Sequence, residues 1–398
     1  MTTAAVPTLV GTMGVDGLDT LVGVLAGDGW EVLGPRVRDG VITWGALRSA
    51  GDLPVGVADD QAPGTYRLRD RGDRARFGWA VGPSSPKREL FPPRVPWWEA
   101  RLEGDGLQIT PATPPRRRVA LLGARPCELA AIAVQDRVLL GGPCPDPDYA
   151  ARRRDLLVVA VHCTEPAPTC FCTSMGTGPA ADGGYDLALT ELLHGPGHAE
   201  PVYLVRVGTD RGVQLARRLG LRATTDAELE AEQAALDAAR RRMVRHLRTE
   251  GIVELLATTL EHPRWDDVAA RCLACTNCTL VCPTCFCAAV EEVTDLDGGI
   301  RRERRWDSCF TLGHSEVHGT AVRASVRSRY RQWLTHKLGT WWEQFGTSGC
   351  VGCGRCITWC PVGIDLTEEV AALAETPAET PAATAAAVGA PGGRSGDR

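Results

Sequence analysis

The stretch that decides the fold of this chain reads Cys272-Leu-Ala-Cys275-Thr-Asn-Cys278-Thr-Leu-Val-Cys282-Pro283, and it recurs as Cys350-Val-Gly-Cys353-Gly-Arg-Cys356-Ile-Thr-Trp-Cys360-Pro361. In this C-x-x-C-x-x-C-x-x-x-C-P pattern, three cysteines bind one iron–sulfur cube and the fourth reaches toward a second cube. We therefore assign the cysteines crosswise to two 4Fe-4S clusters. The first cluster takes Cys272, Cys275, Cys278 and Cys360. The second cluster takes Cys350, Cys353, Cys356 and Cys282.

Structural zinc sites are the alternative interpretation of these cysteines. Zinc is usually held by separated C-x-x-C or C-x-x-C-H pairs, each of which supplies two ligands. A repeated triplet with a distant fourth cysteine has more thiols than zinc requires, so the spacing favours clusters. A 4Fe-4S cluster changes its charge by one electron and has no substrate pocket of its own, which predicts electron transfer.

The composition indicates the cellular setting. The chain has 398 residues and a formal net charge of −5, and Lys87 and Lys337 are its only lysines. Its arginines are spread along the sequence and balanced by acids, which argues against nucleic-acid or acidic-membrane partners. The N-terminus has no signal-peptide pattern, and no apolar run is long enough to span a membrane. With 16 cysteines, the chain is therefore expected in the reducing cytoplasm.

The order of the sequence patterns predicts the α+β class: an N-terminal α/β domain, then a helical segment, then a split bacterial dicluster ferredoxin-like domain. Residues 1–115 are rich in short strands and turns, and residues 116–224 carry the α/β pattern. Residues 225–270 form a helical connector that begins with the capping box Thr225 to Glu228. One face of that helix is expected to carry Leu229, Leu236, Ala239, Met243 and Leu247. Residues 271–367 form the cluster domain, and residues 368–398 form the C-terminal end, with a disordered tail from about residue 375.

A long insert, residues 283–349, separates the two cysteine motifs. It is too long for a plain loop, and its stretch from Ala321 to Phe345 has a helical pattern that includes Trp333, Trp341 and Trp342. We expect the insert to pack beside the clusters and to shield them or dock a partner.

A second cysteine group belongs to the α/β domain. Cys127 follows the predicted strand Val119 to Leu122, and Cys163 follows the predicted strand Leu156 to Val161. The carboxyl ends of parallel strands meet at one edge of a sheet, where ligands bind. Cys170 and Cys172 come shortly after, so four thiols can meet at this edge. We predict a third 4Fe-4S cluster on Cys127, Cys163, Cys170 and Cys172; the alternative is that some of these are buried free cysteines.

A further group of cysteines lies in the insert. The phrase Pro-Thr-Cys-Phe-Cys that contains Cys170 recurs at Cys285 and Cys287, and Cys309 follows. These three thiols are candidates for an additional metal site, which His314 or His318 could complete. Alternatively, they pack around the clusters and tune them through S–H contacts. Cys144 is expected to be a free thiol.

Four stretches of the sequence together resemble a known family. They are Gly123-Ala-Arg-Pro-Cys-Glu-Leu-Ala-Ala-Ile132, Cys163-Thr-Glu-Pro-Ala-Pro-Thr-Cys-Phe-Cys-Thr-Ser-Met-Gly-Thr-Gly178, Arg329-Tyr-Arg-Gln-Trp333 and the second cluster motif. Over about residues 30 to 370, the chain resembles the beta subunit of cytoplasmic nickel–iron hydrogenases of the sulfhydrogenase type, and more distantly the A subunit of anaerobic sulfite reductase. The resemblance implies hydrogenase large and small subunits and a flavin subunit that binds NAD or NADP as partners.

The predicted function is therefore an electron relay between a nickel–iron hydrogenase module and a flavin/NAD(P) reductase module. The sequence has no nickel-binding cysteine pairs and no clear nucleotide loop, so we assign no catalytic residue to it. Two alternatives stay open. One is an electron-transfer subunit of an anaerobic sulfite or polysulfide reductase, and the other is a zinc-stabilised scaffold.

Overall fold

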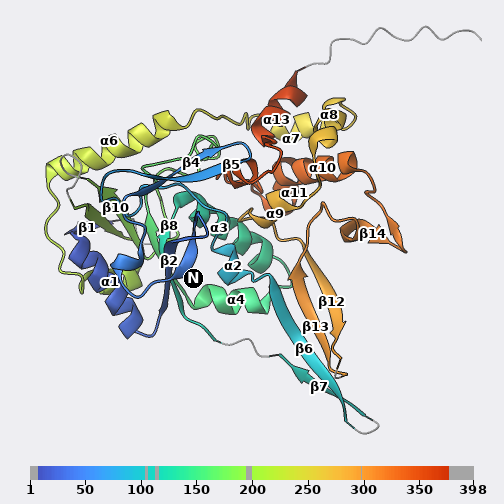
Figure 1. The fold of residues 1–398 in the computed structure, drawn as a ribbon, viewed down its shortest axis with the longest axis horizontal. Helices are drawn as coiled ribbons and strands as arrows, with labels where there is room; N and C mark the ends of the chain where they lie inside the picture. The colour runs from blue at the N-terminus through green and yellow to red at the C-terminus, as the bar shows by residue number, and fades with distance from the viewer. Residues whose placement is uncertain (1–7, 104–105, 113–115, 194–199, 297, 376–398) are drawn as a thin grey trace, which may run out of the picture.

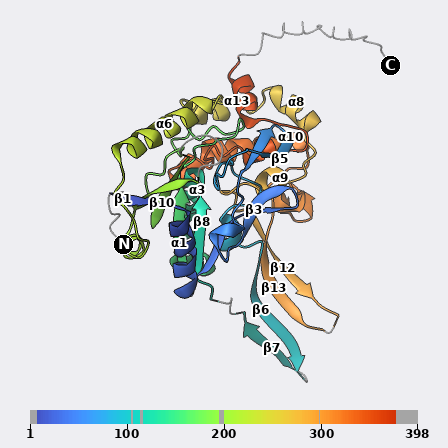
Figure 2. The same ribbon diagram turned by 60° about the vertical axis from the view of Figure 1, so that its left-hand side comes forward.

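The computed structural model describes residues 8–103, 106–112, 116–193, 200–296 and 298–375. It combines a mixed sheet covered by helices, a helical region that carries the cysteine motifs, and a long β arm that extends away from both (Figures 1 and 2). The predicted α+β class is confirmed. The expected tail lies outside the described residues from residue 376 onward.

A seven-stranded sheet forms the α/β part. Its order is β1-β11-β10-β9-β8-β2-β3, and the neighbours β10, β9, β8 and β2 are parallel. The strands predicted at Val119 to Leu122 and Leu156 to Val161 are β8 and β9, which pair in parallel with Val119 opposite Leu156. The sheet draws strands from both the 1–115 and the 116–224 ranges. The bounds are β1 Thr8–Met13, β2 Glu31–Arg38, β3 Val41–Ala46, β8 Val119–Ala124, β9 Leu156–Val161, β10 Leu187–Leu192 and β11 Val202–Val207.

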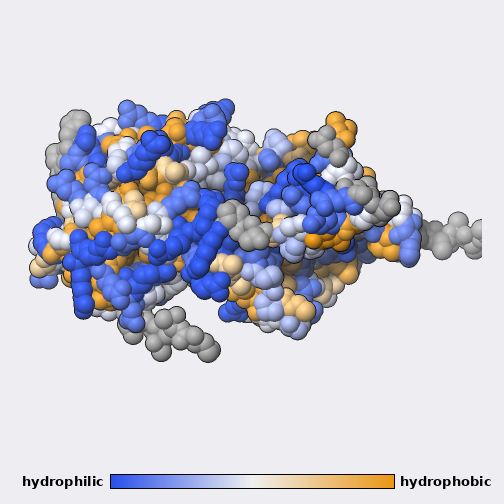
Figure 3. Space-filling model, turned by 90° about the horizontal axis from the view of Figure 1, so that it is seen from below, coloured by the Kyte–Doolittle hydropathy of each residue, from blue (hydrophilic) through white to orange (hydrophobic). Residues whose placement is uncertain are grey.

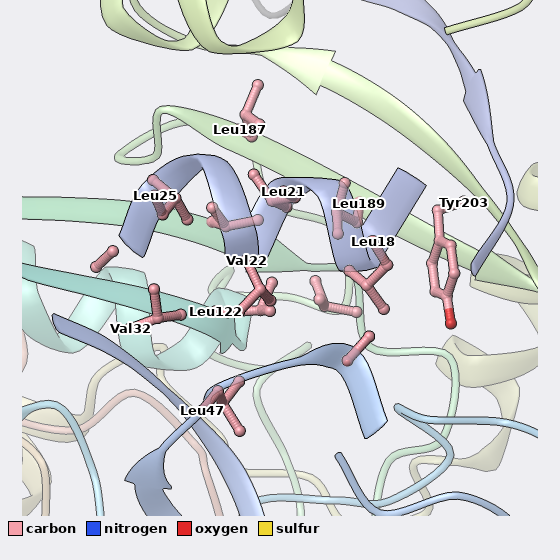
Figure 4. Close-up of a cluster of buried hydrophobic side chains, with 14 of the residues drawn as sticks. Leu18, Leu21, Val22, Leu25, Val32, Leu47, Leu122, Leu187, Leu189 and Tyr203 are labelled. Atoms are coloured by element: carbon pink, nitrogen blue, oxygen red, sulfur yellow. The ribbon is translucent and has the colours of Figure 1, made fainter. Parts of the chain in front are cut away.

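Helices cover both faces of this sheet. One face packs against α1 (Val15–Gly27) and α5 (Asp210–Ala216), and the other packs against α3 (Pro126–Leu140) and α4 (Pro147–Arg154). Successive residues of β8 therefore face opposite cores, and every residue of that strand is buried. Figure 4 shows the α1 side, where Leu18, Leu21, Val22 and Leu25 meet sheet residues. Each fully buried leucine or valine contributes about 1.5–3 kcal/mol.

The helix α6 (Asp226–Arg242) begins at the predicted capping box. The Thr225 hydroxyl accepts a hydrogen bond from the Glu228 amide, and the Glu228 carboxylate accepts one from the Thr225 amide. The helix is shorter than expected, because Met243 leaves the helical conformation at its end. Met243 and Leu247 are still buried, but they lie beyond the helix, and Leu229 is exposed.

Two distant parts of the sequence build the β arm. The hairpin β6 (Arg94–Glu103) and β7 (Gly106–Pro111) pairs edge to edge with the hairpin β12 (Ala288–Thr294) and β13 (Ile300–Trp306), in the order β12-β13-β6-β7. Figures 1 and 2 both show the arm projecting from the body. The other short elements are η1 Ala50–Asp52, β4 Val57–Ala62, β5 Thr65–Asp70, α2 Lys87–Leu90, η2 Gly313–Ser315, β14 Glu316–Val317 and β15 Thr320–Ala321.

The helical region surrounds the cysteine motifs. The predicted helix in the insert begins at Val326, later than expected, and continues to Phe345 through a π-helical turn. Its buried Trp333, Leu334 and Leu338 share one apolar core with Trp265 and several cluster cysteines. The bounds are α7 Ile252–Thr258, α8 Arg264–Arg271, α9 Asn277–Leu280, α10 Val326–Thr335, η3 His336–Thr340, α11 Trp341–Phe345, α12 Arg355–Thr358 and α13 Leu366–Ala374.

No helix among the described residues is both long and apolar enough to cross a membrane. On the face seen from below, hydrophilic residues cover much of the surface and smaller hydrophobic patches lie among them (Figure 3).

Candidate iron–sulfur centres

The two cysteine motifs adopt the same backbone conformation. Two and four residues after the first cysteine of each motif, the backbone has a positive φ: 51° at Ala274 and 69° at Thr276, and 64° and 76° at Gly352 and Gly354. Each loop then enters a short helix, α9 or α12, and these two helices contact each other. Left-handed residues turn the backbone amides inward, which forms an anion-binding nest. The repeat seen in the sequence is therefore also a repeat in three dimensions.

Backbone amides point at the cysteine sulfurs in both loops. The Ala274 amide donates to Cys272 Sγ at 3.4 Å, and the matching Gly352 amide donates to Cys350 Sγ at 3.4 Å. The Ile364 amide donates to Cys360 Sγ at 3.3 Å. Such N–H to sulfur bonds are among the features that set cluster potentials.

The cysteines assigned to the first cluster lie together. Cys272, Cys275, Cys278 and Cys360 line one cavity, although Cys360 belongs to the second motif. Aromatic side chains from the insert close its wall, namely Phe310, Tyr330 and Trp333. Burial raises the pKa of the Cys278 thiol well above its ordinary value, and its three neighbours add to the shift. Four thiols that disfavour one another's charge fit a site that binds the positively charged iron–sulfur core, which neutralises part of the charge of the thiolates.

The cysteines assigned to the second cluster also meet across the two motifs. Burial, and then the thiols of Cys350, Cys353 and Cys282, raise the pKa of Cys356 well above its ordinary value. Cys282 belongs to the first motif, so both fourth cysteines lie at the opposite loop. The pKa of Cys282 itself is lowered, because the Cys285 thiol donates a hydrogen bond to it and Lys337 and Thr284 stabilise the thiolate.

The third predicted group also comes together. Cys127 opens α3 and Cys163 follows β9, and both line a cavity with Cys170 and Cys172. Cys353 of the second motif lines the same cavity. The two parts approach closely, since the Phe171 amide donates to the Gly352 carbonyl at 2.9 Å. A side chain at Gly352 would lie 2.7 Å from the Cys172 backbone, so this approach requires glycine.

Two buried arginines near the third cavity have hydrogen-bond donors that an anionic group in the cavity could satisfy. Arg125 donates to the carbonyls of Phe77, Trp79 and His162, but its Nε has no partner within the described structure. Arg355, whose Nη1 likewise has no partner there, lies beside the thiols of Cys353 and Cys127. Unpaired buried donors are costly, and the sulfides of an iron–sulfur cluster would accept from them. The donor set and its surroundings therefore fit a 4Fe-4S cluster.

The additional cysteines in the insert form a hydrogen-bonded group. Cys309 and His314 both form hydrogen bonds to Cys287, and these bonds lower the pKa of Cys287 to about 4. The pKa of His314 is raised to about 9, first by its bond to Cys287 and then by its bond to Asp307, in which Nδ1 of His314 lies 2.7 Å from Oδ2 of Asp307. Cys285 turns toward Cys282 instead. His318 lies in the exposed turn between β14 and β15, so of the two histidines it is His314 that joins the group.

No three Cys, His, Asp or Glu side chains within the described ranges converge closely enough to hold a single metal ion. The bonds of Cys287 to Cys309 and His314 are of the kind expected from the alternative interpretation of the insert cysteines, which is packing and hydrogen bonding beside the clusters. All 16 cysteines are free of disulfides, and Cys144 is exposed.

Sequence reasoning missed several residues around these centres. The positive φ at Ala274 and Thr276 has no sequence signal, because neither residue favours that conformation. Arg125 lies inside the motif Gly123 to Ile132, but its hydrogen bonds go to backbone carbonyls that are distant in the sequence. Lys337 had one usable signal, namely that lysine is rare in this chain.

Comparison with known proteins gives the class of protein first. Residues 271–364 match the family described as a 4Fe-4S dicluster domain. With the fold and the cysteine loops, this match defines an iron–sulfur electron-transfer subunit.

The particular family follows from a longer match. Sulfhydrogenase 2 subunit beta from Pyrococcus furiosus is 33% identical over 251 residues, which cover 62% of this chain and 72% of the relative. The chain belongs to the family of sulfhydrogenase beta subunits, and the resemblance predicted from the motifs is confirmed.

Proposed function

We propose that this chain relays electrons between a nickel–iron hydrogenase module and a flavin/NAD(P) reductase module through three 4Fe-4S clusters. The ligands are the three sets described above: Cys272, Cys275, Cys278 and Cys360 for the first cluster, Cys350, Cys353, Cys356 and Cys282 for the second, and Cys127, Cys163, Cys170 and Cys172 for the third. Each cluster, when bound, supplies one-electron transfer.

One observation carries this proposal. The second cysteine loop touches both other sets, since Cys353 lines the cavity of the third set and Cys356 lines the cavity of the first. These two contacts support the order third, second, first along the molecule. A linear order is what a relay between two partner modules requires.

The chain's own residues hold, insulate and polarise the sites. Trp333 and Phe310 keep water from the first set, backbone amides donate to the sulfurs of the first two sets, and buried cations lie beside the second. The family membership supports hydrogenase partners, because the relative is a sulfhydrogenase subunit. The sulfite or polysulfide reductase role remains the second candidate. Co-purification separates the two, because only the first places this chain with a nickel–iron large subunit.

Iron content tests the number of clusters. Anaerobically reconstituted full chain should bind about twelve irons, whereas two clusters alone would give about eight. Cys163→Ser should remove about four irons, and the exposed Cys144→Ser should remove none. Eight irons in the parent chain, with no loss in Cys163→Ser, would leave a two-cluster relay.

The crossed assignment has its own test. Cys282→Ala should damage the cluster of the Cys350 loop, and Cys360→Ala should damage the cluster of the Cys272 loop. The two clusters are distinguished by their electron paramagnetic resonance (EPR) signals. Damage by each substitution to the cluster of its own motif would overturn the crossed assignment.

A further inference from the structure

The two lysines of this chain lie at one place. The sequence has 44 basic residues, and all except Lys87 and Lys337 are arginines. The two lysines are 250 residues apart in sequence, yet both are buried, 4% and 3% exposed. Both ammonium groups approach the segment that runs from Thr279 to Cys285, which contains Cys282.

The surroundings of Lys337 identify it as a charged ammonium. Its Nζ lies 3.0 Å from the Gly349 carbonyl, 3.2 Å from Thr284 Oγ1 and 3.4 Å from Cys282 Sγ. An ammonium has three donors and no acceptor, so these three acceptors satisfy it completely. One of the three is the sulfur of a second-cluster ligand.

Lys87 has a similar environment on the other side of the segment. Its Nζ lies 3.2 to 3.5 Å from the carbonyls of Cys285, Leu280 and Thr279, and 4.0 Å from the centre of the Trp306 ring. Three carbonyls and an aromatic face favour a cation, and the thiolates of Cys285 and Cys282 do so too, whereas burial lowers the pKa of Lys87 below its ordinary value. Among the described residues, no carboxylate lies within ion-pair distance of either lysine. Their charges are therefore available to the thiolates and to whatever those thiolates bind.

The choice of lysine has a physical reason. An arginine head group is a large planar fork, whereas an ammonium is a compact point charge. Only a compact group can reach a carbonyl, a hydroxyl and a sulfur from one atom in a filled core. The third cation near this loop, Arg355, also lies beside the Cys353 thiol, but it is paired with Glu128 at 2.5 Å, so a carboxylate offsets its charge, unlike that of either lysine.

We propose that Lys337 and Lys87 raise the reduction potential of the second cluster and so keep it usable as the middle step of the relay. This inference rests on the proposed function, in which the Cys350 set holds that cluster. Reduction adds one electron and no proton, and the electron comes from a neighbouring cluster that is oxidised in the same step. Added negative charge is least favourable at a buried site between two other anionic clusters. Two uncompensated ammonium groups offset that cost.

The first cluster provides the contrast. A buried cation near this set is Arg329, whose guanidinium donates to the carbonyls of Phe310 and Ser325. No lysine or arginine within the described structure donates a hydrogen bond to the sulfurs of this set. Removal of either lysine should therefore change the reduction potential of the second cluster and leave that of the first cluster nearly unchanged.

The test is a potentiometric titration of the iron-loaded full chain, followed by EPR, with Lys337→Met and Lys87→Met. We expect Lys337→Met to lower the potential of the cluster whose signal is lost in Cys282→Ala by at least 59 mV, a tenfold change in the one-electron equilibrium constant. Lys87→Met should lower it by less. The control Arg331→Met removes a cation of the same helix that pairs with Glu261 at the surface, and it should change neither potential.

The outcomes separate this inference from the proposed function. Absence of clusters in the parent chain contradicts the proposed function. Full iron content with unchanged potentials in both lysine variants contradicts the role of the lysines. If Lys337→Met fails to bind iron, Lys87→Met decides, because Lys87 contacts no sulfur: a lowered second-cluster potential supports the role and an unchanged one overturns it.

Discussion

The buried ion pair between Glu128 and Arg355 should be one of the strongest links between the α/β part and the cysteine loops. Arg355 is 1% exposed and Glu128 is 2% exposed. Arg355 donates to Glu128 at 2.5 Å and to the carbonyls of Gly82 and Ser84 at 2.8 and 3.1 Å. Glu128 also accepts from the Arg125 amide at 2.9 Å. Glu128→Ala would leave the guanidinium buried without its counter-charge.

The expected loss follows from this burial. Removal of one partner from a buried pair costs about 3–5 kcal/mol. For 398 residues, an unfolding entropy of about 2.1 cal/mol/K per residue gives about 0.8 kcal/mol/K. The melting temperature should therefore fall by about 4–6 °C, and by more if the chain unfolds in separate parts.

Anaerobic scanning calorimetry of the iron-loaded chain measures this shift. Asp237→Ala, which breaks an exposed pair with Arg240, is the control and should cost at most about 1 kcal/mol. The double variant Glu128→Leu/Arg355→Met replaces both charges by apolar groups and should be less destabilised than Glu128→Ala alone. The reasoning is wrong if Glu128→Ala has the same melting temperature as the Asp237→Ala control. It is also wrong if the melting temperature of the double variant falls as far as that of Glu128→Ala.

Two further predictions concern the helices. Hydrogen bonds from Arg222 hold the pKa of Glu228 at about 2, below its ordinary 4.5, so this pair stabilises the fold fully above pH 4.5 and progressively less as pH falls toward 2. The difference in melting temperature between wild type and Glu228→Gln should shrink over that range; a constant difference would refute the linkage. Trp333→Ala should lower the free energy of unfolding by about 3–5 kcal/mol, because Trp333 is buried in the wall of the first site. The same substitution should speed the bleaching of visible absorbance in air. The exposed Trp342→Ala should do neither, and equal bleaching rates in the two variants would contradict the shielding role.

Local signals in the sequence predicted much of this molecule. The strands β8 and β9 were predicted because both are continuous apolar runs. The cysteine spacing predicted both loops, because ligand geometry leaves few backbone paths. The capping box at Thr225 predicted the start of α6, whereas its end was missed because Met243 and Leu247 continue the apolar period after the backbone has left the helix.

Interactions between distant segments could not be predicted in this way. Strands β6 and β13 pair although about 200 residues separate them, and nothing in either sequence specifies the other. The helix α1 was missed because its region was interpreted from its glycines and short alternating runs. The contact between Gly352 and Cys172 joins two motifs that the sequence presents separately. Its only trace is the glycine, which also has a local explanation as a turn residue.

The long insert between the cysteine motifs has a physical rationale in the crossed ligands. Because each fourth cysteine lies at the opposite loop, contacts between α9 and α12 hold the two halves together, and the chain between them is free to do other work. The insert uses that freedom close to the clusters: Trp333 walls the first site, and Lys337, four residues later, donates to Cys282 of the second. One helical segment therefore supplies apolar shielding to one site and positive charge to its neighbour. Two sites built from the same repeated motif thereby acquire different surroundings, which is what allows them to differ in potential.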